Sequence, residues 1–387
     1  SLALLGVAAV RVAFGSPEGL PPVERLLDTV QRIGVDVPDL AYLPDQPGMV
    51  GLAEGTSPDG QRYAVKVFGQ DAASRMRAER VWYALWYRNA GLAPRAGRVE
   101  QAQHEALALL LANRAGVGVT ELVGTGRDAG GDVLLVTLRP DGTQLGEHAP
   151  EDLDEHVLCM VWRGLLALHH DARLAHGWVG PNNVLLGARG VTFANFDYSA
   201  TTPTEQQLAT DVVSLLATTA TIVGEDRALD AATTVVDADE LAIALPYVQE
   251  AVVEPALRRV VKQTDVSFGS LRSQLAERLG VDEPELQKVR RVNWSDVLMV
   301  IFGIIAANAL ISQVVDVGLD TLLDTLGTAS ITWLVAAFGI KLLSYTTAYM
   351  GLKAVVARPI PFGPTTLLQP ARAFIGLVVP FGRVGVD

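Results

Sequence analysis

Two charged side chains in separate apolar segments are of types that could together bind a phosphate ester. Lys66 lies in the middle of the strand-like run RYAVKVF, between apolar neighbours, and Glu105 lies in the apolar-periodic segment HEALALLL. A glutamate beside a lysine can hold the ammonium group extended toward phosphate oxygens. Taken alone, Lys66 is better explained as a surface lysine on an edge strand, so its interpretation depends on the residues C-terminal to it.

Two loops further along the chain carry amide and carboxylate oxygens, which are ligands that Mg²⁺ accepts. His176 and Asn183 stand at the ends of HGWVGPNN, and Asn195 and Asp197 flank a phenylalanine in ANFDYSA. Short strand-like runs surround both loops, which predicts that they lie side by side. Asn183 and Asp197 are therefore the candidate metal ligands.

The elements that must position these residues follow the order of a protein kinase. A β-rich region from about Gly48 has a turn signal at Pro58-Asp59-Gly60 and a strand, Ala64 to Val67, that resembles the V-A-I-K strand. A helix with Glu105, two further strands and a largely helical second half come next. We expect an α+β two-lobe, protein-kinase-like domain over residues 41–290, with the N-lobe at about 41–140 and the C-lobe at about 141–290.

The catalytic positions of that pattern are degenerate. Trp178 stands where the H-R-D-L-x-x-x-N motif has its aspartate base, and an indole can donate but cannot accept the substrate proton. Asn195 replaces the metal-binding aspartate of D-F-G, and Asp197 replaces its glycine. The sequence therefore predicts a pseudokinase with no intact catalytic residue. Lys66, Glu105, Asn183, Asn195 and Asp197 remain as a candidate site for ATP and Mg²⁺.

Two alternatives to an inactive regulator or scaffold stay open. One is a membrane-tethered atypical kinase acting on a small molecule or a protein, with Asp197 binding the metal. The other is an interaction module whose docking face includes Trp82 and Trp86, although an aromatic stripe at helical spacing is more often part of a core. The glycines at 48, 51 and 55 are spaced too loosely to establish a phosphate-binding loop.

Charge is spread unevenly along the 387 residues. The net charge is −12, but residues 291–387 hold only 6 basic and 5 acidic side chains. An acidic body repels phosphate, which argues against a nucleic-acid partner. The single cysteine, Cys159, cannot form an intrachain disulfide and fits a cytoplasmic location. The six histidines fall in no zinc-like pattern.

Two apolar segments after the body predict membrane helices. Residues 297–315 contain no charge, and residues 328–352 contain only Lys341. Basic side chains lie before the first segment and after the second, while the loop between them is acidic, so the positive-inside rule places the body on the cytoplasmic side. Lys341 is expected to face a protein interior or a wet cavity, or to extend toward the interface. A buried helix in a soluble core is the competing interpretation of the first segment.

The remaining segments complete the expected organisation. Residues 1–14 read as the end of an upstream membrane helix, residues 15–40 as a linker helix, and residues 291–387 as the start of an incomplete α-helical transmembrane domain. Prolines and glycines break the apolar segment 359–387, which is tolerated at membrane depth only where the backbone is buried in protein or lines a cavity. The expected location is the plasma membrane, in a multi-pass arrangement with a lipid bilayer as partner.

The chain as a whole resembles the actinobacterial lysylphosphatidylglycerol-synthase transmembrane (flippase-like) family, in which a kinase-like domain is inserted between membrane parts. The resemblance rests on VRVAFGSPEGLPPVERLLDTVQRIGV, YAVKVFGQDAASR, HEALALLLANRAGV, RLAHGWVGPNNVLL, ALPYVQEAVV and LLQPARAFIGLVVPFGRVGV. The last matches the family's broken P-x-G-x-x-G segment at Pro380, Gly382 and Gly385.

The resemblance implies further membrane helices on both sides and a role in handling lipids or lipid-linked precursors, with a lipid substrate. Relatives have an arginine and an aspartate after the catalytic-loop histidine and an ordinary D-F-G-like triad. Gly177, Trp178 and Asn195 depart from that pattern. The departure concerns catalysis and leaves the expected fold unchanged.

Overall fold

The chain divides into two compact units, Ser1–Arg291 and Val292–Asp387. The computed structural model describes residues 20–44, 50–69 and 97–289 of the first unit, and residues 298–299, 302–303, 324, 327–328 and 330–355 of the second. The first unit thus contains most of the described residues.

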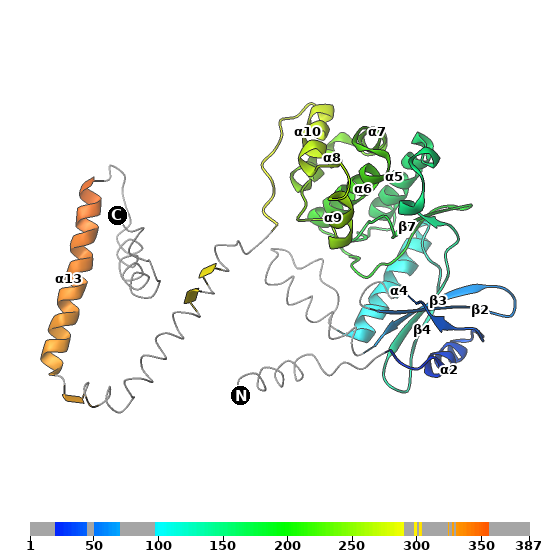
Figure 1. Ribbon diagram of the computed structural model, residues 1–387, viewed down its shortest axis with the longest axis horizontal. Coiled ribbons are helices and arrows are strands. Elements are labelled where there is room, and N and C mark those ends of the chain that lie inside the picture. Colours follow the sequence, from blue (N-terminus) through cyan, green and yellow to red (C-terminus); the bar gives the residue numbers. More distant parts are fainter. Residues whose placement is uncertain are drawn as a thin grey trace. The chain divides into compact units, whose positions relative to one another are not determined.

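The first unit begins with a small lobe built on a five-stranded antiparallel sheet in the order β1-β2-β3-β5-β4 (Figure 1). The strands are β1 (Ala41–Tyr42), β2 (Gly51–Thr56), β3 (Arg62–Phe68), β4 (Leu122–Arg127) and β5 (Val133–Leu138). The predicted turn between β2 and β3 is present. The Gly60 amide donates to the Ser57 carbonyl at 2.9 Å, and Gly60 has a φ of +86°, which glycine adopts without strain.

A helix covers each face of this sheet. Alternate residues of β5 point to opposite faces, so Leu134 and Val136 pack with α2 (Val23–Ile33), while Val133 and Leu135 pack with α4 (Arg98–Arg114). The α2 side is a separate small core of ten buried apolar residues: Leu26, Val30, Val35, Val37, Leu40, Ala53, Val65, Val67, Leu134 and Val136.

The packing of α2 corrects the expected role of residues 15–40. Leu26 and Val30 have no exposed side-chain surface, because they close one face of the sheet. The described part of that segment is therefore a structural element of the small lobe, which extends upstream of the predicted start at residue 41. The spacing of apolar residues in VERLLDTVQRI shows an amphipathic helix, but it does not show which surface the helix covers.

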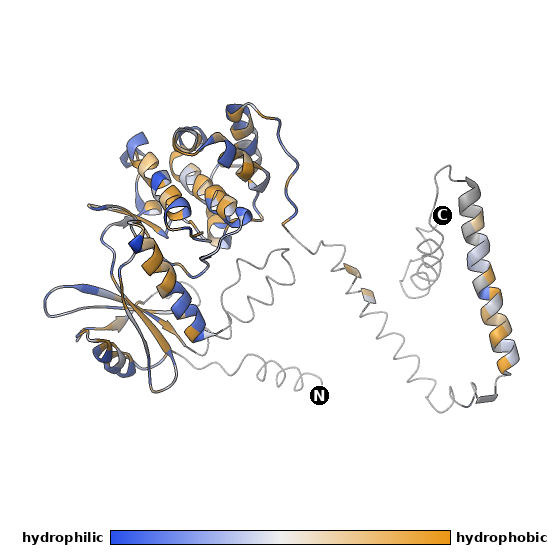
Figure 2. Cartoon of the chain, turned by 180° about the vertical axis from the view of Figure 1, so that it is seen from behind, coloured by the Kyte–Doolittle hydropathy of each residue, from blue (hydrophilic) through white to orange (hydrophobic). Residues whose placement is uncertain are grey.

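The second lobe is mostly helical and surrounds α6, whose residues from Ala209 to Ala220 are all buried. Its elements are β6 (Thr143–Gln144), η2 (Leu145–Glu147), η3 (Pro150–Asp152), α5 (Glu155–His170), β7 (Val184–Gly187), β8 (Gly190–Phe193), α6 (Glu205–Val223), α7 (Glu225–Val235), α8 (Ala238–Ala244), η4 (Leu245–Tyr247), α9 (Pro255–Val261) and α10 (Phe268–Leu279). A reciprocal capping box between Thr204 and Gln207 fixes the start of α6. Figure 2 shows that the helices of this lobe carry both apolar and hydrophilic residues.

In the second unit the described residues include one long helix, α13 (Ile331–Val355). Its described large apolar side chains are exposed, for example Trp333 at 77% and Phe338 at 67%. Among the residues that the structure describes, no helix is long and apolar enough to cross a bilayer. Lys341, in the second predicted span, is exposed, and its ammonium lies 5.6 Å from the centroid of the Tyr345 ring. Most of the first predicted span lies outside the described residues.

Candidate functional site

Lys66 of β3 reaches Glu105 of α4 across the α4 side of the sheet. Its neighbours Val65 and Val67 face α2, so strand alternation turns Lys66 the other way. The Lys66 Nζ–Glu105 Oε1 distance is 2.6 Å, and the Glu105 side chain is only 3% exposed. Burial and the nearby Asp197 carboxylate raise the pKa of Glu105 above its usual range, and the Lys66 ammonium partly opposes this rise.

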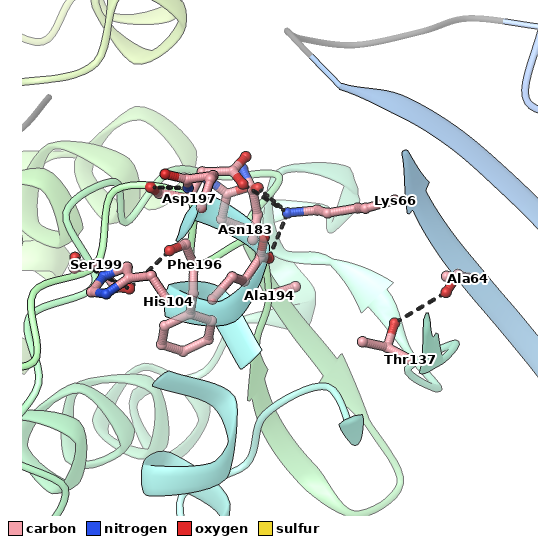
Figure 3. Close-up of polar contacts among 12 residues, drawn as sticks. Ala64, Lys66, His104, Thr137, Asn183, Ala194, Phe196, Asp197 and Ser199 are labelled. Atoms are coloured by element: carbon pink, nitrogen blue, oxygen red, sulfur yellow. Dashed lines mark hydrogen bonds and ion pairs between the residues drawn. The ribbon is translucent and has the colours of Figure 1, made fainter. Parts of the chain in front are cut away.

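The same ammonium also binds the predicted metal loop. Lys66 Nζ lies 2.8 Å from Asn195 Oδ1 and 3.2 Å from Asp197 Oδ1 (Figure 3). Burial alone would lower the pKa of Lys66, but the Asp197 and Glu105 carboxylates outweigh it and raise that pKa. Lys66 therefore joins β3, α4 and the loop after β8 through one charged group.

Asn195 adopts a left-handed backbone conformation, with φ at +67°, which asparagine tolerates better than most residues. Its Nδ2 lies 3.5 Å from Asn183 Oδ1, and Asn183 Nδ2 donates to the Trp178 carbonyl at 2.9 Å. The structure thus connects Lys66, Glu105, Asn183, Asn195 and Asp197 through side-chain contacts in one group.

The loop that carries His176 is packed in a way that excludes the missing catalytic groups. The Trp178 ring stacks on Tyr198, with ring centroids 3.5 Å apart and an interplanar angle of 23°. Gly177 has a φ of +88°, and a Cβ there would lie 2.7 Å from the Tyr198 carbonyl carbon. A side chain at 177 would therefore strain the backbone and collide with the segment that carries Tyr198.

His176 serves this loop as a buried structural residue. Its Nε2 lies 3.0 Å from the Ala194 carbonyl, and its Nδ1 accepts the Trp178 amide at 3.3 Å. One nitrogen donates and the other accepts, which matches a neutral imidazole. Burial also lowers the pKa of His176.

Asp211 of α6 binds the backbone of the same loop. No sequence motif had pointed to this residue. Its carboxylate accepts the backbone amides of His176 at 2.6 Å and Gly177 at 2.8 Å, and the side chain is fully buried. The signal available in the sequence was a lone aspartate in the apolar run LATDVVSLL, since a buried carboxylate needs partners of its own.

The side chains that have come together do not fit a Mg²⁺-nucleotide well. A magnesium ion needs near-octahedral oxygen ligands, but Asn195 and Asp197 already direct oxygens to the Lys66 ammonium. A dication bound to Asp197 Oδ1 would sit against that positive charge. Among the described residues, no group of three or more histidine, cysteine or acidic side chains could hold a metal ion.

The two described glycines of the loose glycine pattern have structural reasons that need no phosphate. A Cβ at Gly51 would lie 2.6 Å from Leu20 Cδ2, and one at Gly55 would lie 2.9 Å from the Leu40 backbone. The chain segment around α2 packs too closely on β2 for a side chain at either position. Gly48 lies outside the described residues.

A strand lysine paired with a helix glutamate, a small antiparallel sheet and a helical lobe that carries both loops together define a known architecture. The described part of the first unit has a protein-kinase-like, two-lobe α+β fold. The kinase-like domain keeps the lysine–glutamate pair and lacks an aspartate at both catalytic positions.

No protein-family model matches the chain, and no curated protein matches it. Solved structures that align with it include the kinase domain of Mycobacterium tuberculosis PknI, with 15% identity, 63% of this chain and 98% of that chain covered, and a TM-score of 0.32. Vaccinia related kinase 3 aligns at 13% identity over 72% of this chain and 97% of its own, with a TM-score of 0.34. An aminoglycoside-3'-phosphotransferase of type VIII aligns at 14% identity over 54% and 92%, with a TM-score of 0.36.

The comparisons lend no support to the predicted membership of the lysylphosphatidylglycerol-synthase family or to the flippase-like role. Pro380, Gly382 and Gly385 lie outside the described residues, as do Trp82 and Trp86. The predictions that depend on these five residues stay predictions.

Proposed function

We propose that the kinase-like domain is a pseudokinase that acts as a regulator or scaffold. The observation that carries the proposal is the stacked pair of Trp178 and Tyr198 at the position of the catalytic base. An indole cannot accept the proton of a substrate hydroxyl. Gly177 has no room for a side chain, so the loop cannot take up the H-R-D sequence without being rebuilt.

Lys66 has a structural role in this proposal. In an active kinase the strand lysine contacts nucleotide phosphates, whereas here its ammonium binds three side-chain oxygens of the domain itself. Removing one partner of a buried charge cluster leaves the others uncompensated, so Lys66 stabilises the contact between the two lobes.

Thermal unfolding of the full chain with ATP, with and without Mg²⁺, tests the proposal. We expect no Mg²⁺-dependent rise in Tm and no transfer of phosphate from labelled ATP. A Lys66→Met variant should unfold at a lower temperature than the wild type whether or not ATP is present. A Mg²⁺-dependent rise in Tm that Asp197→Asn abolishes would instead support the atypical-kinase alternative.

We also propose that the second unit attaches the domain to a lipid bilayer. The supporting observations are the nineteen uncharged residues at 297–315 and the exposed apolar side chains of α13. The orientation with the kinase-like domain in the cytoplasm follows from the basic flanks. A role in handling lipids or lipid-linked precursors rests on the family resemblance alone.

A further inference from the structure

A groove on the helical lobe lies away from the Lys66 site and has no assigned role. It has a volume of about 550 Å³ and is lined by residues at the end of α5, the start of α6 and along α8. That volume is within the range of sites that bind small ligands or single peptide side chains.

The rim of the groove is acidic. Glu205, Asp237, Asp239 and Glu240 line it, and His170 is the only other titratable residue among the described lining residues. His170 Nε2 lies 3.3 Å from Glu240 Oε2, so the histidine faces one of the four carboxylates. No lysine or arginine is among these lining residues, so the rim has a net negative charge, and His170 partly compensates only Glu240.

The floor of the groove is apolar. Leu208 and Val212 come from one side of α6, and Ile243 comes from α8. Ile243 is 42% exposed, although other apolar residues of the same helix are buried in the lobe. An apolar floor that is exposed at Ile243, inside a rim of net negative charge, favours a ligand with an apolar group and several positive charges.

A buried histidine lies beside one of the rim carboxylates. His169 is 1% exposed, its Nδ1 lies 3.8 Å from Glu240 Oε1, and its Nε2 lies 3.2 Å from Asp211 Oδ2. His169 Nδ1 has no hydrogen-bond partner in the described part of the chain. Glu240 thus has two histidines beside it, His169 on its buried side and His170 on its exposed side.

From these features we propose that the groove binds a cationic segment of a partner protein, with one apolar side chain of that segment on the floor and its lysines or arginines on the rim. This interaction does not depend on whether the kinase-like domain is catalytically active. Binding should weaken as salt rises, because rim charges are exposed and screened.

The test measures binding of a short fluorescein-labelled peptide of arginine and serine with one central leucine to the full chain in neutral detergent micelles. Fluorescence anisotropy should show saturable binding that weakens with added NaCl. A peptide with glutamate in place of arginine should not bind. The variant E205Q/D237N/D239N should bind the cationic peptide about ten-fold more weakly, as expected for the loss of three exposed ion pairs.

A matched control removes the same charge elsewhere. E277Q/D282N/E285Q replaces three exposed carboxylates outside the groove and should change affinity less than two-fold. Ile243→Ser, which alters an already exposed side chain, should weaken binding of the leucine-containing peptide but not of a peptide with alanine at that position.

Three results would overturn the proposal. Both triple variants could lose equal affinity, which would mean that only net charge matters. The groove triple variant could bind as tightly as the wild type. Light scattering could show that the full chain is a dimer that Ile243→Ser separates, which would assign the groove to a second copy of this chain.

Discussion

At the scale of single residues, the side chains that replace the kinase catalytic motif are part of the packing of the loop. Trp178 has a stacking partner in Tyr198, and Gly177 has a left-handed backbone that only glycine adopts freely. The two positions depend on each other, because the Tyr198 carbonyl occupies the space of a side chain at 177. Restoring an aspartate at 178 alone would therefore not restore a catalytic loop.

Glu254 beside this loop makes the stability of the domain depend on pH. Its Oε2 lies 3.2 Å from where a Cβ of Gly180 would be, and burial raises the pKa of Glu254 to about 7, with Arg259 partly opposing the rise. A raised carboxyl pKa means that the folded state binds the proton more tightly than the unfolded state. The contribution of Glu254 to folding stability is fully present below the pKa of this residue in the unfolded state, near 4.5. It is lost as pH rises through 7, the pKa in the folded state.

We therefore expect Glu254→Gln to raise Tm relative to the wild type at pH 8 and to have little effect at pH 5. The expected gain in the free energy of unfolding at pH 8 is on the order of 1–2 kcal/mol, a figure reduced to allow for solvent screening of the partly exposed side chain. Thermal unfolding at both pH values measures it, with the exposed Glu277→Gln as the control. Equal Tm changes at the two pH values would contradict the expectation.

At the scale of elements, α6 organises the site although none of its residues is in a kinase motif that we identified. Its buried Asp211 accepts two backbone amides of the loop and lies 3.2 Å from His169 Nε2. Thr218, two turns further along the same face of α6, donates to the Val179 carbonyl at 3.0 Å. Hydrogen bonds from one helix, α6, thus fix the conformation of residues 176–179.

Asp211→Asn should destabilise the domain by about 2–4 kcal/mol, because an amide supplies one acceptor where the carboxylate supplies two and leaves a buried amide donor unpaired. Urea unfolding followed by tryptophan fluorescence measures the change. Asp171→Asn, at an exposed position after α5, should leave the midpoint unchanged. An Asp211→Asn midpoint equal to that of the wild type would show that the loop does not need this carboxylate.

At the scale of the whole chain, two units with different surface chemistry are joined near residue 291. The first unit buries its apolar residues in two cores, and the described helix of the second unit exposes them. A large exposed apolar surface in an aqueous protein marks a site of association with another apolar phase. Under the proposed attachment of the second unit to a membrane, the bilayer would be that phase.

The full chain should float with phosphatidylcholine–phosphatidylglycerol vesicles in a density gradient, and high salt should not release it. A triple substitution of Ile304, Ile305 and Leu310 by lysine should reduce the floating fraction, because each charge at the centre of a span costs about 2.5–3.5 kcal/mol. The control carries three lysines at exposed positions of the first unit, Gln103, Asn113 and Gln263. Equal flotation of the two variants would argue against insertion of residues 297–315.

How much of the site the sequence predicts depends on how local each signal is. Lys66 and Glu105 were found because they stand at the expected places in an ordered series of kinase-like segments, although neither residue is decisive by itself. Asp211 was missed because its partners are backbone amides 34 and 35 residues away, which no spacing rule reports. The glycines at 51 and 55 were likewise unexplained until α2 was seen to pack on β2.

The sequence by itself determined the two-lobe order, the β2–β3 turn, the loss of the two catalytic aspartates and the contrast between an acidic body and a charge-poor tail. Residue type, periodicity and local spacing are enough to predict these features. Only the tertiary structure decided that Lys66 binds three oxygens of the domain, that Trp178 stacks on Tyr198, and that α2 belongs to the small lobe. Each of these is a contact between segments far apart in the chain, and its energy depends on burial that the fold creates.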